Sequence, residues 1–322
     1  MSKNLWIFFT VIFVVLFTSP HASSQAYPDR PVKIVVPNPP GGPTDLVGRL
    51  IGQKLAELWG QPVIIENKVG AGGNIGTSYV AKSKPDGYTV LVQTSSLVAN
   101  MRLFVNPGYD LEKDLIGISN MGATPNIIVT SINSPIKSIK DLINNPKFQK
   151  INYGSPGVGT TAHLSLDYFF KTHGNNEAVH IGYKGAAPAL TALMSGELDL
   201  ASSAMPPAVP FVKTDKMRAL AVTGTKRSFV LPNVPTLAEQ GIQDMDLYTW
   251  VGLFVPKETP ESLIRKIRED MDKILQQKDV LDKLKSYGFE TENESMSDFA
   301  KTISKELVYW QKVLAVTGTK PQ

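Results

Sequence analysis

The stretch VPNPPGGPTDLVGRLIGQKL, from Val36 to Leu55, gives the first indication of the fold class. An apolar strand leads into a loop of Pro and Gly, and a helix then opens at Thr44 and Asp45. The first N–H groups of a helix have no partner inside it and lie at its partially positive end, so such junctions often bind anions. The stretch therefore predicts an α/β protein and raises the question of which anion it binds.

Strands and helices alternate in the same way along the rest of the chain. Leu46, Leu50, Ile51 and Leu55 recur at helical spacing after the first strand. Further short apolar runs predict strands, and the segments between them predict helices. The expected strands are VKIVVP, PVIIEN, YTVLVQT, INYGS, LDLASS and MRALAVTG, and the expected helices include IGTSYVAKSK, TTAHLSLDYFFKT and PALTALMSG. This alternation is typical of α/β units with largely parallel sheets.

Two extended segments, Thr124–Pro135 and Tyr248–Pro256, lie more than 100 residues apart and both end in proline. Between them lies a self-contained run of α/β units. We therefore expect two lobes joined by a two-strand hinge, the layout of a protein that closes on a ligand. The expected lobe 1 comprises residues 27–127 plus 251–322, and the expected lobe 2 comprises residues 128–250.

The C-terminal part of the chain is predicted to be helical. Apolar residues recur at helical spacing from Glu261 to about Tyr287, which predicts one long helix. A last helix is expected over roughly Ser297–Val316.

The N-terminal 26 residues have the pattern of a cleavable signal peptide. Lys3 precedes the apolar run LWIFFTVIFVVLF, which is followed by the small and polar TSPHASSQA. The apolar core of about 13 residues is shorter than the roughly 20 that a membrane-spanning helix needs, although an uncleaved anchor is the alternative. We expect cleavage after Ala26, which places the mature chain outside the cytoplasm.

Composition and motifs argue against several classes of function. The chain has a net charge of +4, with no concentrated basic stripe of the kind that binds nucleic acid. It has no cysteine and therefore no thiolate nucleophile. Ser155 misses the nucleophile motif G-x-S-x-G because Tyr153 occupies the first glycine position. His163, His173 and His180 fit no compact zinc pattern. We therefore expect no catalytic residue, metal or cofactor, and the rival hypothesis is a secreted hydrolase that uses Ser155 and His163.

Three Gly-rich turns, at residues 37–45, 70–76 and 154–161, each follow a strand and open a helix. No lysine follows their glycines at phosphate-loop spacing, and Ile75 occupies the third glycine position of a dinucleotide motif. Each turn alone also fits a plain strand-to-helix connection, and Asp45 alone fits a helix N-cap. Elimination leaves a carboxylate as the candidate anion.

Six stretches together resemble the substrate-binding proteins of tripartite tricarboxylate transporters, also called the Bug family of periplasmic receptors. They are YPDRPVKIVVPNPPGGPTDLVGRLIGQKL, PVIIENKVGAGGNIGTSYVAKSKPDGYTVL, NYGSPGVGTTAHL, GYKGAAPAL, ALAVTGTKRSFVLPNVPTLAEQG and WVGLFVPKETP. The resemblance implies a two-lobed type II periplasmic binding protein, the Venus-flytrap fold. It also implies a periplasmic monomer that captures a di- or tricarboxylate, acidic amino acid or aromatic acid through backbone amides and water. Such a protein delivers its ligand to membrane permease subunits, and a sensor that only signals is the alternative role.

The same resemblance implies which residues contact the ligand. In lobe 1 these are Asn38, Gly41, Gly42, Thr44, Asp45, Thr94 and Ser95. In lobe 2 they are Ser155, Gly159, Thr160, Thr161, Tyr183 and Lys184. A solvated turn residue is the alternative interpretation of Lys184. Asn38 stands where the family usually has an aromatic residue. The serines at positions 202 and 203 stand where many members have an acidic residue that can bind an amine, which disfavours an amino-acid ligand.

Overall fold

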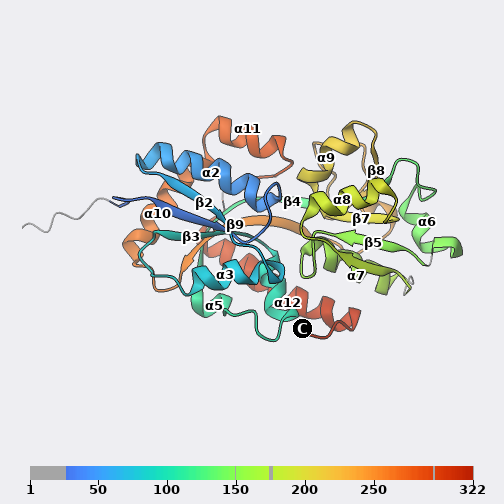
Figure 1. Cartoon of the computed structure of the whole chain (residues 1–322), viewed down its shortest axis with the longest axis horizontal. Coiled ribbons are helices and arrows are strands. Elements are labelled where there is room, and N and C mark those ends of the chain that lie inside the picture. The colour runs from blue at the N-terminus through green and yellow to red at the C-terminus, as the bar shows by residue number, and fades with distance from the viewer. Residues whose placement is uncertain (1–26, 149, 174–176, 293, 322) are drawn as a thin grey trace, which may run out of the picture.

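The computed structural model describes residues 27–148, 150–173, 177–292 and 294–321. The chain forms an elongated α/β molecule in which the two expected lobes lie end to end (Figure 1). The predicted signal peptide falls on residues 1–26 and lies outside the described residues. Within the described part of the chain, no helix combines the length and apolar character needed to cross a bilayer.

Lobe 1 is built on strands from the N-terminal part of the chain. β1 (Val32–Val36) pairs in parallel with β2 (Val63–Asn67) on one side and with β3 (Thr89–Thr94) on the other. β1 is a β-branched apolar segment whose buried face belongs to the lobe core. The helices that follow these strands are α2 (Pro43–Trp59), α3 (Asn74–Ala81), α4 (Ser96–Leu103) and α5 (Leu111–Asp114), with a short 3₁₀ turn at Ala71–Gly73.

Lobe 2 repeats this arrangement with its own strands and helices. β5 (Asn152–Ser155) lies between β6 (Val179–Gly182) and β7 (Leu200–Ala204), both parallel to it. β8 (Met217–Val222) pairs with the long strand β4. The helices are α6 (Ile139–Asn144), α7 (Thr161–Thr172), α8 (Ala186–Ser195) and α9 (Met205–Lys213), with 3₁₀ turns at Pro146–Phe148 and Ala238–Gln240.

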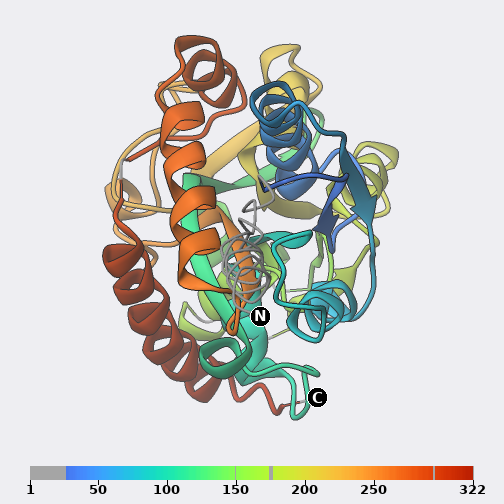
Figure 2. The ribbon, with the colours of Figure 1, turned by 90° about the vertical axis from the view of Figure 1, so that its left-hand side faces the viewer.

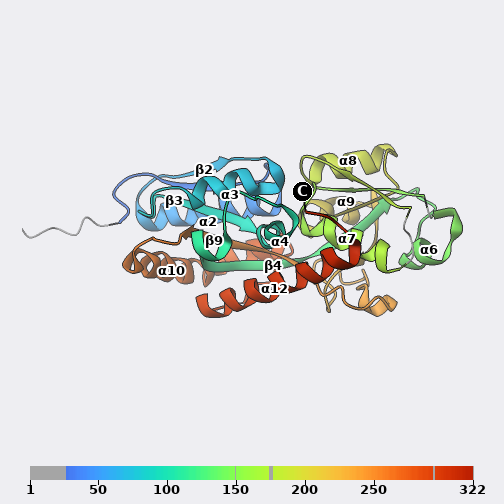
Figure 3. The same ribbon diagram turned by 90° about the horizontal axis from the view of Figure 1, so that it is seen from below.

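Two long antiparallel strands join the lobes. β4 (Leu115–Ser131) pairs with β9 (Tyr248–Pro256) from Leu115 opposite Pro256 to Pro125 opposite Tyr248. β9 continues the lobe 1 sheet beside β3, whereas the end of β4 continues the lobe 2 sheet beside β7. The strands that were predicted as crossovers therefore run between the lobes (Figure 3), and β4 begins nine residues earlier than the predicted segment.

The C-terminal helices differ from the sequence prediction in one respect. The single helix expected from Glu261 to about Tyr287 is wrong, because α10 (Glu261–Leu275) and α11 (Lys278–Ser286) are separate. Gln277 is extended (φ −68°, ψ 129°), which ends the first helix. The break allows Val280 and Leu284 of α11 to join the apolar cluster that also contains Ile267 of α10.

The last helix, α12 (Met296–Thr317), runs along both lobes (Figure 3). It packs against α4 of lobe 1 and α7 of lobe 2. Its residues Trp310 and Leu314 share a buried apolar cluster with Phe169 and Phe170 of α7. Figure 2 shows α10 and α12 along one side of the molecule and the N-terminal strands on the other. A third element therefore spans the two lobes in addition to the hinge strands.

Candidate ligand-binding site

A cavity of about 90 Å³ lies between the lobes. At about 10–15 Å³ for each water position, this space holds on the order of six waters, so it suits a small ligand. Lobe 1 contributes residues 38–44 and Thr94, and lobe 2 contributes residues 160–162 and 184–188 with Pro156 and Ala204. Asn126 of β4 and Thr249 of β9 line it from the hinge.

The cavity is lined by eight of the thirteen residues that the family resemblance implied as ligand contacts. From lobe 1 these are Asn38, Gly41, Gly42, Thr44 and Thr94, and from lobe 2 they are Thr160, Thr161 and Lys184. Five other predicted residues lie outside its lining: Asp45, Ser95, Ser155, Gly159 and Tyr183. Their contacts, described below, hold the backbone behind the lining.

Three helix N-termini meet at the cavity. α2 starts after Gly42, α7 after Thr160 and α8 after Gly185. The first N–H groups of each helix have no acceptor within the helix, and each N-terminus has a partial positive charge. The Gly-rich turns at residues 37–45 and 154–161 thus reach the cavity. The turn at residues 70–76 does not line it, and the carbonyl of Gly72 instead accepts a hydrogen bond from Asn100.

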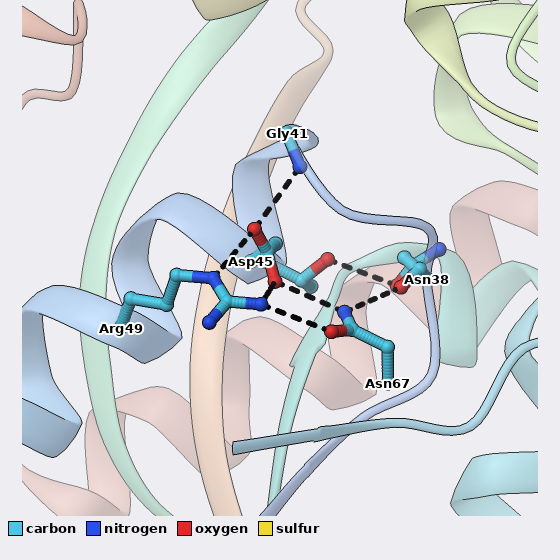
Figure 4. A network of polar contacts seen from close by, with 6 residues as sticks. Asn38, Gly41, Asp45, Arg49 and Asn67 are labelled. Carbon is cyan, nitrogen blue, oxygen red and sulfur yellow. Dashed lines mark hydrogen bonds and ion pairs between the residues drawn. The ribbon is translucent and has the colours of Figure 1, made fainter.

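The side chain of Asp45 holds the turn at residues 37–45 in place (Figure 4). Its carboxylate accepts hydrogen bonds from the N–H of Gly41, from Arg49 Nε and from Asn67 Nδ2, each at 3.0 Å. Burial acts to raise the pKa of Asp45, but the hydrogen bonds from Arg49, Gly41 and Asn67 outweigh it and hold the pKa below its usual value. Asp45 is therefore ionised and its charge is balanced by Arg49.

Asp45 is not the helix N-cap that its sequence position alone suggested. Gly42 occupies the N-cap position, and Asp45 lies one turn inside the helix with its side chain directed back to the N–H of Gly41. The loop is held further by Thr44, whose hydroxyl donates to Asn38 Oδ1 at 3.1 Å, and by Asn67, which donates to the Asn38 carbonyl at 3.0 Å. These hydrogen bonds hold the loop at the edge of the cavity in one conformation.

Asn126 and Thr249 were not predicted from the sequence. The Thr249 hydroxyl donates to Asn126 Oδ1 at 2.9 Å, and the Thr161 hydroxyl oxygen lies 2.5 Å from that of Thr249. All three side chains are buried. They form a polar group that joins both hinge strands to the start of α7. An asparagine inside the apolar run TPNIIVTS was the available sequence signal for this group.

A family model described as "Tripartite tricarboxylate transporter family receptor" matches residues 47–318. The chain belongs to this receptor family. Its architecture is accordingly that of a solute-binding receptor, as the resemblance implied.

Three solved structures are similar to this receptor over most of its length. The periplasmic binding protein BugD is 31% identical and has a TM-score of 0.86, over 92% of this chain and 100% of that chain. Rpa4515 of R. palustris, solved with adipate, is 33% identical with a TM-score of 0.86, over 91% and 98%. MatC from Rhodopseudomonas palustris, solved with bound malate, is 30% identical with a TM-score of 0.82, over 89% and 100%.

Ser155 of the receptor is buried and lies beside two histidines, His163 and the half-buried His180. Its hydroxyl oxygen is 2.7 Å from His180 Nε2, whereas His163 Nδ1 accepts a hydrogen bond from the N–H of Gly159 at 3.4 Å. The two imidazole rings lie 3.8 Å apart. Burial lowers the pKa of His163 to about 3, with a further contribution from His180, and lowers that of His180 to about 4. Both imidazoles are therefore neutral at neutral pH, and the group supports the loop that leads to α7.

The remaining predicted residues also support the backbone. The N–H of Ser95 donates to the Trp250 carbonyl, and the N–H of Tyr183 donates to the Ser155 carbonyl at 3.0 Å. Gly159 has a positive φ of 82°, and a Cβ there would lie 2.4 Å from Asn100 Oδ1. Only glycine fits this position without displacing Asn100.

The charge around the cavity favours an anion. Among the described residues that line it, none is aspartate or glutamate, and Lys184 is the charged side chain. Lys184 is exposed and has no ion-pair partner among the residues that the structure describes. The described part of the chain also contains no cluster of His, Asp and Glu suited to a metal ion. Helix N-termini and one ammonium group therefore provide the positive potential of the site.

Proposed function

We propose that this receptor binds a small organic carboxylate between its lobes and delivers it to the permease subunits of a tripartite tricarboxylate transporter. The observation that supports this most directly is the meeting of three helix N-termini at a cavity that lacks acidic side chains. The structural relatives solved with adipate and with malate support the same class of ligand.

The expected strength of binding follows from these donors. Each hydrogen bond from the protein to an ionised group contributes roughly 1.5–3 kcal/mol. Four such bonds contribute roughly 6–12 kcal/mol before the cost of ordering the ligand, a range that includes the about 8 kcal/mol of micromolar affinity. No catalytic residue is needed for this function. Ser155, the nucleophile of the rival hydrolase hypothesis, is fully buried, which supports a receptor that releases its ligand unchanged.

The location and movement of the protein are part of the proposal. We infer export to the periplasm by the predicted signal peptide of residues 1–26, followed by function as a monomer. The lobes, residues 27–127 plus 251–322 and residues 128–250, close on the ligand by bending β4 and β9. The similar protein BugD is a periplasmic binding protein, which supports this location.

A thermal-shift screen tests the proposed function. The purified protein is unfolded and refolded to remove bound ligand, and then heated with a panel of di-, tri- and aromatic carboxylates. A ligand present at 100 times its Kd adds about 2.7 kcal/mol to the stability of the folded state and raises the Tm by several degrees. A shift with recovery of the unchanged acid supports a receptor. Chemical conversion of the acid, or a panel without any shift, contradicts the proposal.

A further inference from the structure

Asn126, one of the residues that line the cavity, has an unused hydrogen-bond donor. Its side chain is completely buried and lines the cavity from β4. Its Oδ1 accepts from Thr249 at 2.9 Å and lies 3.4 Å from the Thr161 hydroxyl, but Nδ2 has no partner among the described residues. Because an unpaired buried donor destabilises a folded protein, a ligand oxygen that accepts from Nδ2 recovers a lost interaction.

The contacts of Oδ1 hold the side chain in place. Thr249 belongs to the other hinge strand and Thr161 to the start of α7, so the amide is held from two elements. Asn126 also belongs to the hinge itself, where its backbone N–H donates to the Thr223 hydroxyl at 2.9 Å. A ligand bonded to Nδ2 would therefore contact the element about which the lobes move.

Among the described residues that line the cavity around Asn126, no carboxylate is available to pair with the ammonium group of a ligand. None of the described lining residues is acidic, and the nearby carboxylate of Asp45 is already bonded to Gly41, Arg49 and Asn67. The charged group that does line the cavity, Lys184, would repel a second cation. Burying an unpaired ammonium group is unfavourable, so an amino acid would lose the affinity that its carboxylates gain.

We propose that Asn126 donates from Nδ2 to an oxygen of the bound acid and that the receptor selects carboxylates without an ammonium group over the corresponding amino acids. This inference rests on the proposed function, and it adds a specificity-determining residue and a narrower class of ligand. Asn126 favours an oxygen over an amine because its free polar atom is the donor Nδ2, whereas its acceptor Oδ1 already accepts from Thr249.

Paired ligands test the selectivity. Binding to the refolded protein is measured by calorimetry for succinate and aspartate, glutarate and glutamate, adipate and 2-aminoadipate, and phenylpropionate and phenylalanine. Whichever pair binds, the acid is expected to bind at least about 100-fold more tightly than its amino counterpart, since buried polar groups left unpaired are strongly discriminated against. An amino acid that binds as tightly as its paired acid overturns the inferred selectivity but leaves the proposed function standing. If none of the eight binds and the thermal-shift panel also gives no shift, the proposed function is overturned as well.

Two substitutions test the role of Asn126. Asn126→Asp replaces the donor by a carboxylate of the same shape, so the affinity for the preferred acid is expected to fall at least about 100-fold at pH 7.5. The preference over the amino counterpart is expected to shrink at least 10-fold. Asn126→Ser replaces the amide donor with a shorter hydroxyl and adds no charge, and it is expected to weaken acid binding about 10-fold.

Asn106→Asp is the matched control, since it adds the same charge on an exposed loop. Asn106 Oδ1 accepts from the N–H of Gly108, a bond that an aspartate also makes. Affinity in this variant is expected to match that of the unmodified protein, and circular dichroism confirms the folding of all three variants. If folded Asn126→Asp and Asn126→Ser bind the acid as the unmodified protein does, the role of Asn126 is refuted while the receptor function remains.

Discussion

The two faces of hinge strand β9 differ in chemistry, although their residues alternate along one strand. Thr249 lines the cavity, whereas the next residue, Trp250, donates from Nε1 to Glu306 Oε1 of α12 at 2.7 Å. Consecutive side chains of a strand point to opposite faces, so the cavity and α12 lie on opposite sides of the same short segment. The cavity face has the uncharged Thr249 hydroxyl, which donates to the Asn126 amide. The ionisable carboxyl of Glu306 contacts the other face.

This separation has a consequence for pH dependence. Burial raises the pKa of Glu306 to about 8 despite the hydrogen bond from Trp250 that favours its ionised form. The carboxyl is therefore largely protonated at neutral pH. The hydroxyl and amide groups on the cavity face do not titrate in this range. We expect ligand affinity to depend on the cavity face and the pH dependence of stability to depend on the helix face.

The largest effect is expected for Thr161→Pro on the cavity side. Proline is well tolerated at the first position of a helix, and the preceding residue, Thr160, already has the extended conformation that it requires (φ −73°, ψ 150°). The substitution removes a backbone donor and the hydroxyl next to Thr249. Affinity for the panel acid is expected to fall at least 100-fold by calorimetry, while the far-ultraviolet circular dichroism is unchanged.

Thr161→Val is the control for this variant, because it removes the hydroxyl but keeps the N–H. A loss of about 10-fold is expected, corresponding to one hydrogen bond of about 1.4 kcal/mol. Equal affinity in Thr161→Pro and the unmodified protein would show that the start of α7 does not bind the ligand.

A smaller effect on affinity is expected for Thr249→Val. The two side chains have nearly the same shape, but valine leaves Asn126 Oδ1 without its closest donor, so the amide is less well oriented. Affinity is expected to fall about 10-fold.

On the opposite face, Trp250→Phe removes the hydrogen bond to Glu306 and is expected to lower the Tm without changing ligand affinity. Equal losses of affinity in the two variants would abolish the distinction between the faces.

Local patterns in the sequence predicted the two-lobed α/β fold, whereas the residues expected at the cavity were implied by the family resemblance. The run at residues 32–36 is short, apolar and β-branched, and the Pro/Gly turn after it could only open a helix. Gly-rich turns, however, look alike in a sequence. The turn at residues 70–76 follows β2, which forms the edge of the sheet, whereas the turn at residues 37–45 follows β1 inside it and reaches the cavity.

The hinge residues could not be predicted in this way. Asn126 lies in an apolar run, and its proximity to Thr249 depends on pairing between segments more than 100 residues apart. The break between α10 and α11 was missed because apolar spacing continues across Gln276 and Gln277. In both cases tertiary packing, rather than local sequence, determines the structure.

The smallest effect is expected for Glu306→Gln, which acts on the helix face alone. In the folded protein the pKa of Glu306 is about 8, above that of an unfolded glutamate, so between these values the folded state holds a proton that the unfolded chain releases. The stability from this group is therefore complete at low pH and is lost as the pH rises towards 8. Glutamine has no such proton and should remove this decline.

The measurement is the Tm of both proteins between pH 6.5 and 8.5. This range avoids the opposite contribution of His163 and His180, whose lowered pKa values make the folded state lose stability as the pH falls below about 6.5. The Tm of the unmodified protein is expected to fall by a few degrees more than that of Glu306→Gln. Ligand affinity should be equal in the two proteins at each pH, because Glu306 contacts the face of β9 that the ligand does not reach. A change of affinity in Glu306→Gln would mean that α12 and the cavity are coupled through the strand.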